Sequence, residues 1–102
     1  MIPGQQNAEI EDALTRGPDE LHDALFAWRK ATLERERTES GLYTKFKGQD
    51  KGRTADEIKA LVRADGERYA AVLVELTAEA EHTRVYERLL AAKKLAGLRT
   101  AF

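Results

Sequence analysis

The chain has 102 residues, no cysteine and a formal net charge of −1 at pH 7. This length suits one domain, and the lack of cysteine excludes disulfides, thiol nucleophiles and cysteine-based zinc sites. A net charge near zero argues against a chain built throughout for nucleic acid or an anionic membrane. The N-terminus lacks a basic segment followed by an apolar one, so we expect a cytoplasmic protein that does not enter a membrane.

Few helix breakers and many charges favour an all-α fold. Charged residues make up 34% of the chain, and the only prolines are Pro3 and Pro18. Without proline in an element's interior, long continuous helices are allowed. We therefore predict a single helical domain over residues 1–102, a long antiparallel helical hairpin with coiled-coil-like packing and a short N-terminal helix.

The first predicted element is an N-terminal arm, residues 1–16, with a short helix around the pattern "AEIEDAL". A kink at Gly17-Pro18 would let this arm cover the end of the last helix. Charge favours the same contact, because residues 9–23 carry six acidic side chains and residues 84–102 are rich in lysine and arginine.

The second element is a helix over residues 18–47. Gly17 is a suitable N-cap, and Pro18 suits the first helical position because its missing amide costs nothing there. Leu21, Leu25, Trp28 and Thr32 form one apolar stripe. The helix should end at a turn over residues 48–53, "GQDKGR", whose glycines and aspartate are typical of chain reversal.

The third element is a long helix over residues 54–98. Thr54 followed by Glu57 is a capping box, in which each side chain accepts from the other residue's backbone N–H. Apolar residues then recur at a strict seven-residue interval, which predicts a coiled-coil seam. The seam consists of Val62, Tyr69, Leu76, Thr83 and Leu90.

A turn centred near residue 50 sets the register between the two arms. Leu42 should face Ile58, and Trp28 should face Val72. The same register brings Leu25 to Leu76, Ile10 to Leu90 and Leu14 to Tyr86.

Basic and aromatic side chains gather at the predicted tip, where Tyr43 and Phe46 lie among four cations. Such a combination can bind nucleic acid. The same lysines can also stabilise the C-terminal end of a helix dipole. The candidate nucleic-acid contacts are Lys45, Lys47, Lys51 and Arg53.

We find no pattern that predicts catalysis, a cofactor or a metal site. His22 and His82 could face each other across the hairpin, but neither belongs to a known metal-binding spacing. Glu79 and Glu81 project to different faces of a helix, so they form no general acid–base pair. We expect a protein that is not an enzyme.

Two helices cannot bury all of the large apolar side chains in this sequence. A second copy would cover the remainder in a dimeric helical bundle, so we expect a homodimer that also binds a protein partner not yet identified. The candidate interface residues are Trp28, Phe26, Tyr69, Val72, Leu76, Tyr86 and Leu90.

The cap segment "GRTADEIKALV" and the C-terminal "RLLAAKKLAGL" resemble the small helical-hairpin accessory proteins of bacteriophages and prophages. This resemblance implies an accessory protein that acts by binding and assigns no site residue. The sequence thus predicts a helical-hairpin interaction protein, with nucleic-acid binding through the tip or the C-terminus as the alternative.

Overall fold

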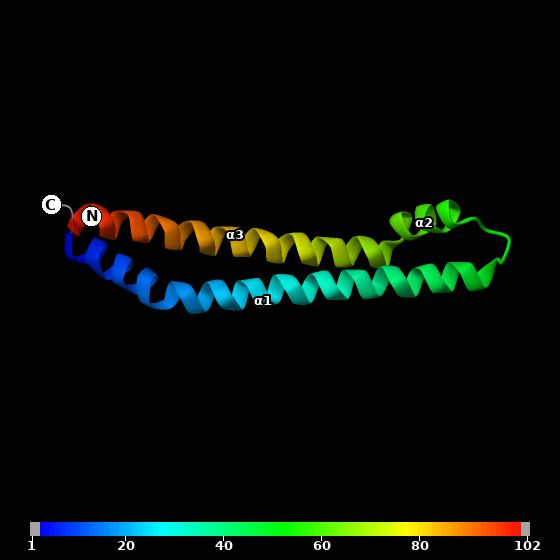
Figure 1. The fold of residues 1–102 in the computed structure, drawn as a ribbon, viewed down its shortest axis with the longest axis horizontal. Helices are drawn as coiled ribbons and strands as arrows, with labels where there is room; N and C mark the ends of the chain where they lie inside the picture. The colour runs from blue at the N-terminus through cyan, green and yellow to red at the C-terminus, as the bar shows by residue number, and fades with distance from the viewer. Residues whose placement is uncertain (1–2, 101–102) are drawn as a thin grey trace. The chain divides into compact units, whose positions relative to one another are not determined.

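The computed structural model describes the backbone of residues 3–100 and the side chains of residues 7–98. This part of the chain forms three helices, α1 (Pro3–Gln49), α2 (Ala55–Ala64) and α3 (Gly66–Thr100) (Figure 1). The predicted all-α hairpin is confirmed. Residues 1–2 and 101–102 of the predicted domain lie outside the described part.

The chain divides into two compact units. Unit 1 comprises Met1–Ala27 and Glu79–Phe102, and unit 2 comprises Trp28–Ala78. Within each unit, a segment of α1 lies against a segment of α3 that runs in the opposite direction (Figure 1).

In unit 1, the predicted boundary between an N-terminal arm and a second helix is wrong. α1 runs without interruption from Pro3 and includes Pro18 in its interior. An interior proline removes one backbone hydrogen bond and crowds the preceding turn, which bends a helix without necessarily ending it. The blue part of α1 is accordingly bent and not broken (Figure 1).

Small residues bring the two helices of unit 1 close together. Gly17 is buried, and a Cβ atom added there would lie 2.7 Å from Cδ1 of Leu89. Ala24 on α1 and Ala92 on α3 are also buried. Gly17 therefore serves close packing in the interior of α1, and it is not the N-cap that the sequence predicted.

The core of unit 2 lies next to the tip. Leu42 of α1 packs with Ile58 and Val62 of α2, and Tyr43 and Phe46 cover this cluster. The predicted contact between Leu42 and Ile58 is confirmed. Ile58 is the most deeply buried of the three, with 2% of its surface exposed.

The turn of unit 2 is shorter than predicted, because α1 continues through Gln49. Asp50 organises the turn: its carboxylate accepts from the Gly52 amide at 2.9 Å, and its carbonyl accepts from the Arg53 amide at 3.2 Å. Thr54 then caps α2, accepting from the Glu57 amide at 3.2 Å. The predicted threonine cap is confirmed.

The predicted single helix over residues 54–98 is wrong, because the chain breaks at Asp65. This residue is extended, with φ −74° and ψ 137°, and its amide donates to the Val62 carbonyl at the end of α2. Its carboxylate accepts from the Glu67 amide at 2.8 Å, so Asp65 also caps the start of α3. Aspartate before glycine is a known helix-start and turn signal that the seven-residue pattern obscured.

The break shifts the register of unit 2. The predicted register placed Asp65 opposite Arg35, but Arg35 instead pairs with Glu75, at 2.7 Å. Val72 is therefore not level with Trp28 as predicted. In unit 1, the predicted register placed Thr83 opposite Gly17, whereas Leu89 lies there.

The predicted seam of α3 is also on the wrong side of the helix. Tyr69, Leu76 and Leu90 are exposed, whereas Val85, Leu89 and Ala92 are buried. Leu89 lies one residue, or about 100°, around the helix from Leu90, and Val85 and Ala92 each lie two residues, or about 200°, from the seam positions Thr83 and Leu90. Val62 is the one predicted apolar seam residue that is buried, and it lies in α2.

Candidate binding surfaces

Two of the four tip cations have contacts within unit 2. Arg53 donates from Nη1 to the Phe46 carbonyl at 2.9 Å, which satisfies a carbonyl near the C-terminal end of α1. The ammonium of Lys45 lies 5.9 Å from the centre of the Phe46 ring. Lys47 and Lys51 are exposed. The predicted nucleic-acid contacts are therefore brought to one end of unit 2, but Arg53 and Lys45 also support the tip itself.

A charged cluster occupies the helix interface of unit 2. Arg35 donates to Glu39 at 2.5 Å and to Glu75 at 2.7 Å, and the side chains of Arg35 and Glu75 are 25% and 17% exposed. The hydrogen bond to Glu39, followed by that to Glu75, raises the pKa of Arg35 and keeps it charged. The apolar pattern of the sequence does not reveal this cluster, because its three members are charged and lie on two different helices.

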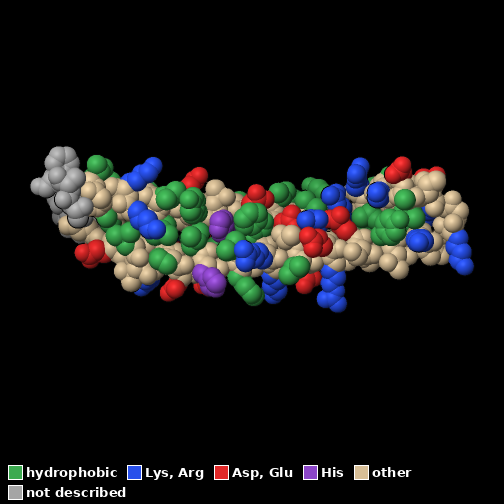
Figure 2. Space-filling model, viewed as in Figure 1, with side chains coloured by type: hydrophobic (Ala, Val, Ile, Leu, Met, Phe, Trp, Pro, Cys, Tyr) green, Lys and Arg blue, Asp and Glu red, His purple; other side chains and the backbone are tan. Residues whose placement is uncertain are grey.

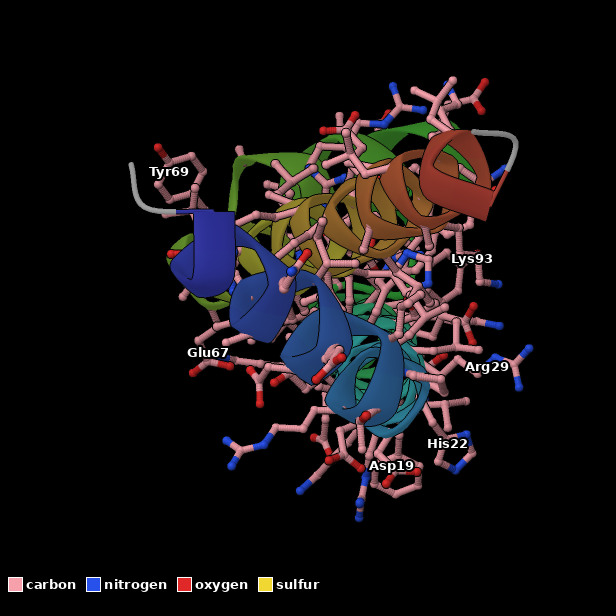
Figure 3. All side chains as sticks on the ribbon, turned by 90° about the vertical axis from the view of Figure 1, so that its left-hand side faces the viewer. Asp19, His22, Arg29, Glu67, Tyr69 and Lys93 are labelled. Atoms are coloured by element: carbon pink, nitrogen blue, oxygen red, sulfur yellow. The ribbon has the colours of Figure 1, made fainter. Side chains whose placement is uncertain are left out.

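Unit 2 exposes an apolar stripe on α3. Tyr69 is 64% exposed, Leu73 46% and Leu76 52%. Their spacing of four and three residues places them on one helix face. The side chain of Tyr69 points away from the helices (Figure 3). Leu33 on α1 and Val74 on α3 are exposed outside this stripe.

The other predicted interface residues differ in exposure. Phe26, Tyr86 and Leu90 are exposed in unit 1, and the Tyr86 ring stacks on His82 with 6.4 Å between ring centres. Trp28 and Val72 of unit 2 are half-buried. Most of the predicted interface is thus available on the single chain.

Unit 1 also contains an ion pair that links its two helices, between Arg88 of α3 and Glu20 of α1. The predicted attraction between the acidic N-terminal segment and the basic C-terminal segment is therefore present for this pair. A second exposed pair, Arg84 with Glu81, lies along α3. Its hydrogen bonds lower the pKa of Glu81 and raise that of Arg84.

A groove in unit 2 escaped the sequence prediction. All three helices line it, and its volume is about 630 Å³. Basic side chains gather over the tip end of the molecule, around an apolar patch (Figure 2). The lining residues are Glu39, Ser40, Tyr43, Thr44, Lys59, Val62, Arg63 and Arg68. Only the break at Asp65, which was not predicted, brings Arg68 to α2, so sequence spacing alone could not reveal the groove.

The histidines do not form a shared site. His22 points outward from α1 (Figure 3), and His82 is half-buried beside Tyr86. Within the described residues, no group of three or more histidine, aspartate or glutamate side chains is arranged to hold a metal ion. No helix in the same part of the chain is long and apolar enough to cross a membrane.

Comparison with known proteins identified no relative of this chain. No protein-family model, no curated protein and no solved structure matches this chain.

Proposed function

We propose that this protein acts by binding, as a non-enzymatic helical hairpin that docks on protein partners, the first of which is a second copy of itself. The observation that carries this proposal is the exposed stripe of Tyr69, Leu73 and Leu76 on α3 of unit 2. Large apolar side chains at helical spacing are the usual contact surface for another helix.

The stripe suits a second copy because the same stripe on that copy can pack against it. In an antiparallel pair of α3 helices related by a two-fold axis near Leu73, Tyr69 of one copy would meet Leu76 of the other. A two-fold contact uses the same patch on both subunits, so one stripe completes the interface. An aromatic residue facing a leucine also buries more area than two leucines would.

Analytical ultracentrifugation over a concentration series tests the proposal. We expect the parent protein to dimerise in the micromolar range and the double variant Tyr69→Lys/Leu76→Lys to remain monomeric with unchanged helical content. Val74→Lys is the matched control, because Val74 is 61% exposed on the same helix but outside the stripe. A parent that stays monomeric at high micromolar concentration would contradict self-association. Equal dissociation by Val74→Lys would exclude the stripe as the interface.

Nucleic-acid binding through the tip is the second proposal, supported by the exposure of Lys47 and Lys51. Phosphate contacts weaken steeply with salt, so binding to labelled DNA and RNA over a salt series separates the two functions. We expect the parent to show no binding at physiological salt. Salt-sensitive binding that Lys47→Gln/Lys51→Gln reduces would favour the nucleic-acid function.

A further inference from the structure

The groove of unit 2 is large enough to hold a small organic molecule. Its volume of about 630 Å³ lies within the range of about 300–1,000 Å³ that is usual for ligand sites. α1 contributes the hydroxyl-bearing residues Ser40, Tyr43 and Thr44, and α2 contributes the apolar Val62. The lining thus offers both polar groups and an apolar wall.

Three cations line this groove without an acidic partner. Lys59, Arg63 and Arg68 form no ion pair within 4.0 Å among the described residues, whereas Arg35, Arg84 and Arg88 each form at least one. The one carboxylate in the lining, Glu39, is held by Arg35. Three positive charges against one negative charge leave the lining with a formal charge of +2.

Two of these cations repel each other, and a bound anion would offset this repulsion. Lys59 and Arg63 are four residues apart on α2, a spacing at which like charges repel and destabilise a helix. Both line the same groove.

Arg68 adds a second, independent observation. Its Nε atom is buried and has no hydrogen-bond partner among the described residues. A buried donor without an acceptor destabilises the folded protein. A negative charge in the groove would stabilise this guanidinium.

We propose that the groove binds a phosphate monoester attached to an apolar or aromatic body. A monoester carries a charge of about −1.5 to −2 at pH 7 and three strong acceptor oxygens, which matches a +2 lining better than a single carboxylate does. Arginine and lysine side chains are the usual phosphate partners. Tyr43 and Val62 provide the apolar contact. This inference goes beyond docking on a protein partner and does not depend on it.

Titration calorimetry with phenyl phosphate tests the assignment, with benzoate and phenol as comparison ligands. We expect saturable binding of phenyl phosphate, at least about tenfold weaker binding of benzoate and none of phenol, since each lost charged hydrogen bond is worth about 1.5 kcal/mol or more. Affinity for phenyl phosphate should fall below pH 6, where the monoester loses its second charge. Backbone amide NMR shifts should be confined to the segments that line the groove.

Single substitutions locate the site. Arg68→Gln and Lys59→Gln should each lower the affinity about tenfold, while the tip variant Lys47→Gln/Lys51→Gln, in the same unit but outside the groove, should leave it unchanged. Lys59 is exposed, so its variant carries the test if Arg68→Gln fails to fold.

Three results would overturn the proposal. The first is the absence of saturable phenyl phosphate binding. The second is equal affinity for benzoate and phenyl phosphate. The third is equal loss of affinity in the groove and tip variants, which would indicate a diffuse charge effect. Tighter binding of an oligonucleotide than of phenyl phosphate, sensitive to Arg68→Gln, would replace the monoester with nucleic acid as the ligand.

Discussion

At the residue scale, the pair of Arg35 and Glu75 determines how the helices of unit 2 align. Both side chains lie mainly in the helix interface, and Glu39 completes the charged cluster. A partly buried charge whose partner moves away is left without compensation, so a shifted register would be penalised. Small and apolar side chains elsewhere along the interface discriminate between registers less sharply. We infer that this pair fixes the alignment of α1 and α3 within unit 2.

Replacing one member of the pair should therefore destabilise the protein more than replacing both. Arg35→Met leaves Glu75 without its partner and should lower the free energy of unfolding by about 2 kcal/mol. The double variant Arg35→Met/Glu75→Met removes both charges and should recover most of this loss. Urea denaturation of the parent, both single variants and the double variant measures the coupling. Additive losses in the double variant would show that the pair contributes nothing to the alignment.

At the element scale, capping residues determine where the helices of unit 2 begin. Thr54 and Asp65 perform the same task, each accepting a backbone N–H from the first turn of the following helix. Thr54 was predicted because Glu57 follows it at the spacing of a capping box. Asp65 was missed because Val62 and Tyr69 keep the seven-residue interval across the break. A periodic pattern records which residues are apolar but not whether the backbone between them is continuous.

The cap at Thr54 should contribute measurably to stability. Thr54→Ala leaves the Glu57 amide without its acceptor and should lower the free energy of unfolding by about 1 kcal/mol. Thr77→Ala is the matched control, since Thr77 lies inside α3 and its hydroxyl donates to the Leu73 carbonyl of the same helix. Alanine favours helix interiors, so this control should be neutral or slightly stabilising. Equal denaturation midpoints for the two variants would argue against the cap.

Pro18 shows the same limit of sequence reasoning. The sequence offered a good helix start at Gly17-Pro18, yet α1 continues through both residues. Packing favours the continuous helix, because Gly17 in the interior of α1 lies close against Leu89 of α3. Tertiary contacts thus override a local start signal. Because Gly17 and Leu89 are far apart in the sequence, the residues next to Gly17 do not predict this contact.

At the scale of the whole molecule, α1 buries small residues along much of its inner face and leaves some large apolar residues exposed. Gly17, Ala24 and Ala31 are buried along α1 at seven-residue intervals, while Phe26 and Leu33 are exposed. The sequence correctly predicted the all-α hairpin, the Thr54 cap and the contact of Leu42 with Ile58, because these depend on composition and on signals close to the turn. Between Gly17 and Ala31 it assigned the inner face to the apolar stripe of Leu21, Leu25 and Trp28, which is only half-buried. Close helix packing favours glycine and alanine instead.

The division into two units predicts that damage to one core remains largely local. Leu42 is 4% exposed in the core of unit 2, and Leu42→Ala should remove about 2–5 kcal/mol of packing energy there. Local opening raises amide exchange only where contacts are lost. Hydrogen–deuterium exchange should therefore accelerate in residues 42–62 and much less in residues 85–92. Leu89→Ala, in the core of unit 1, should give the reverse pattern. Equal acceleration in both units by either variant would show that the chain unfolds as one cooperative domain.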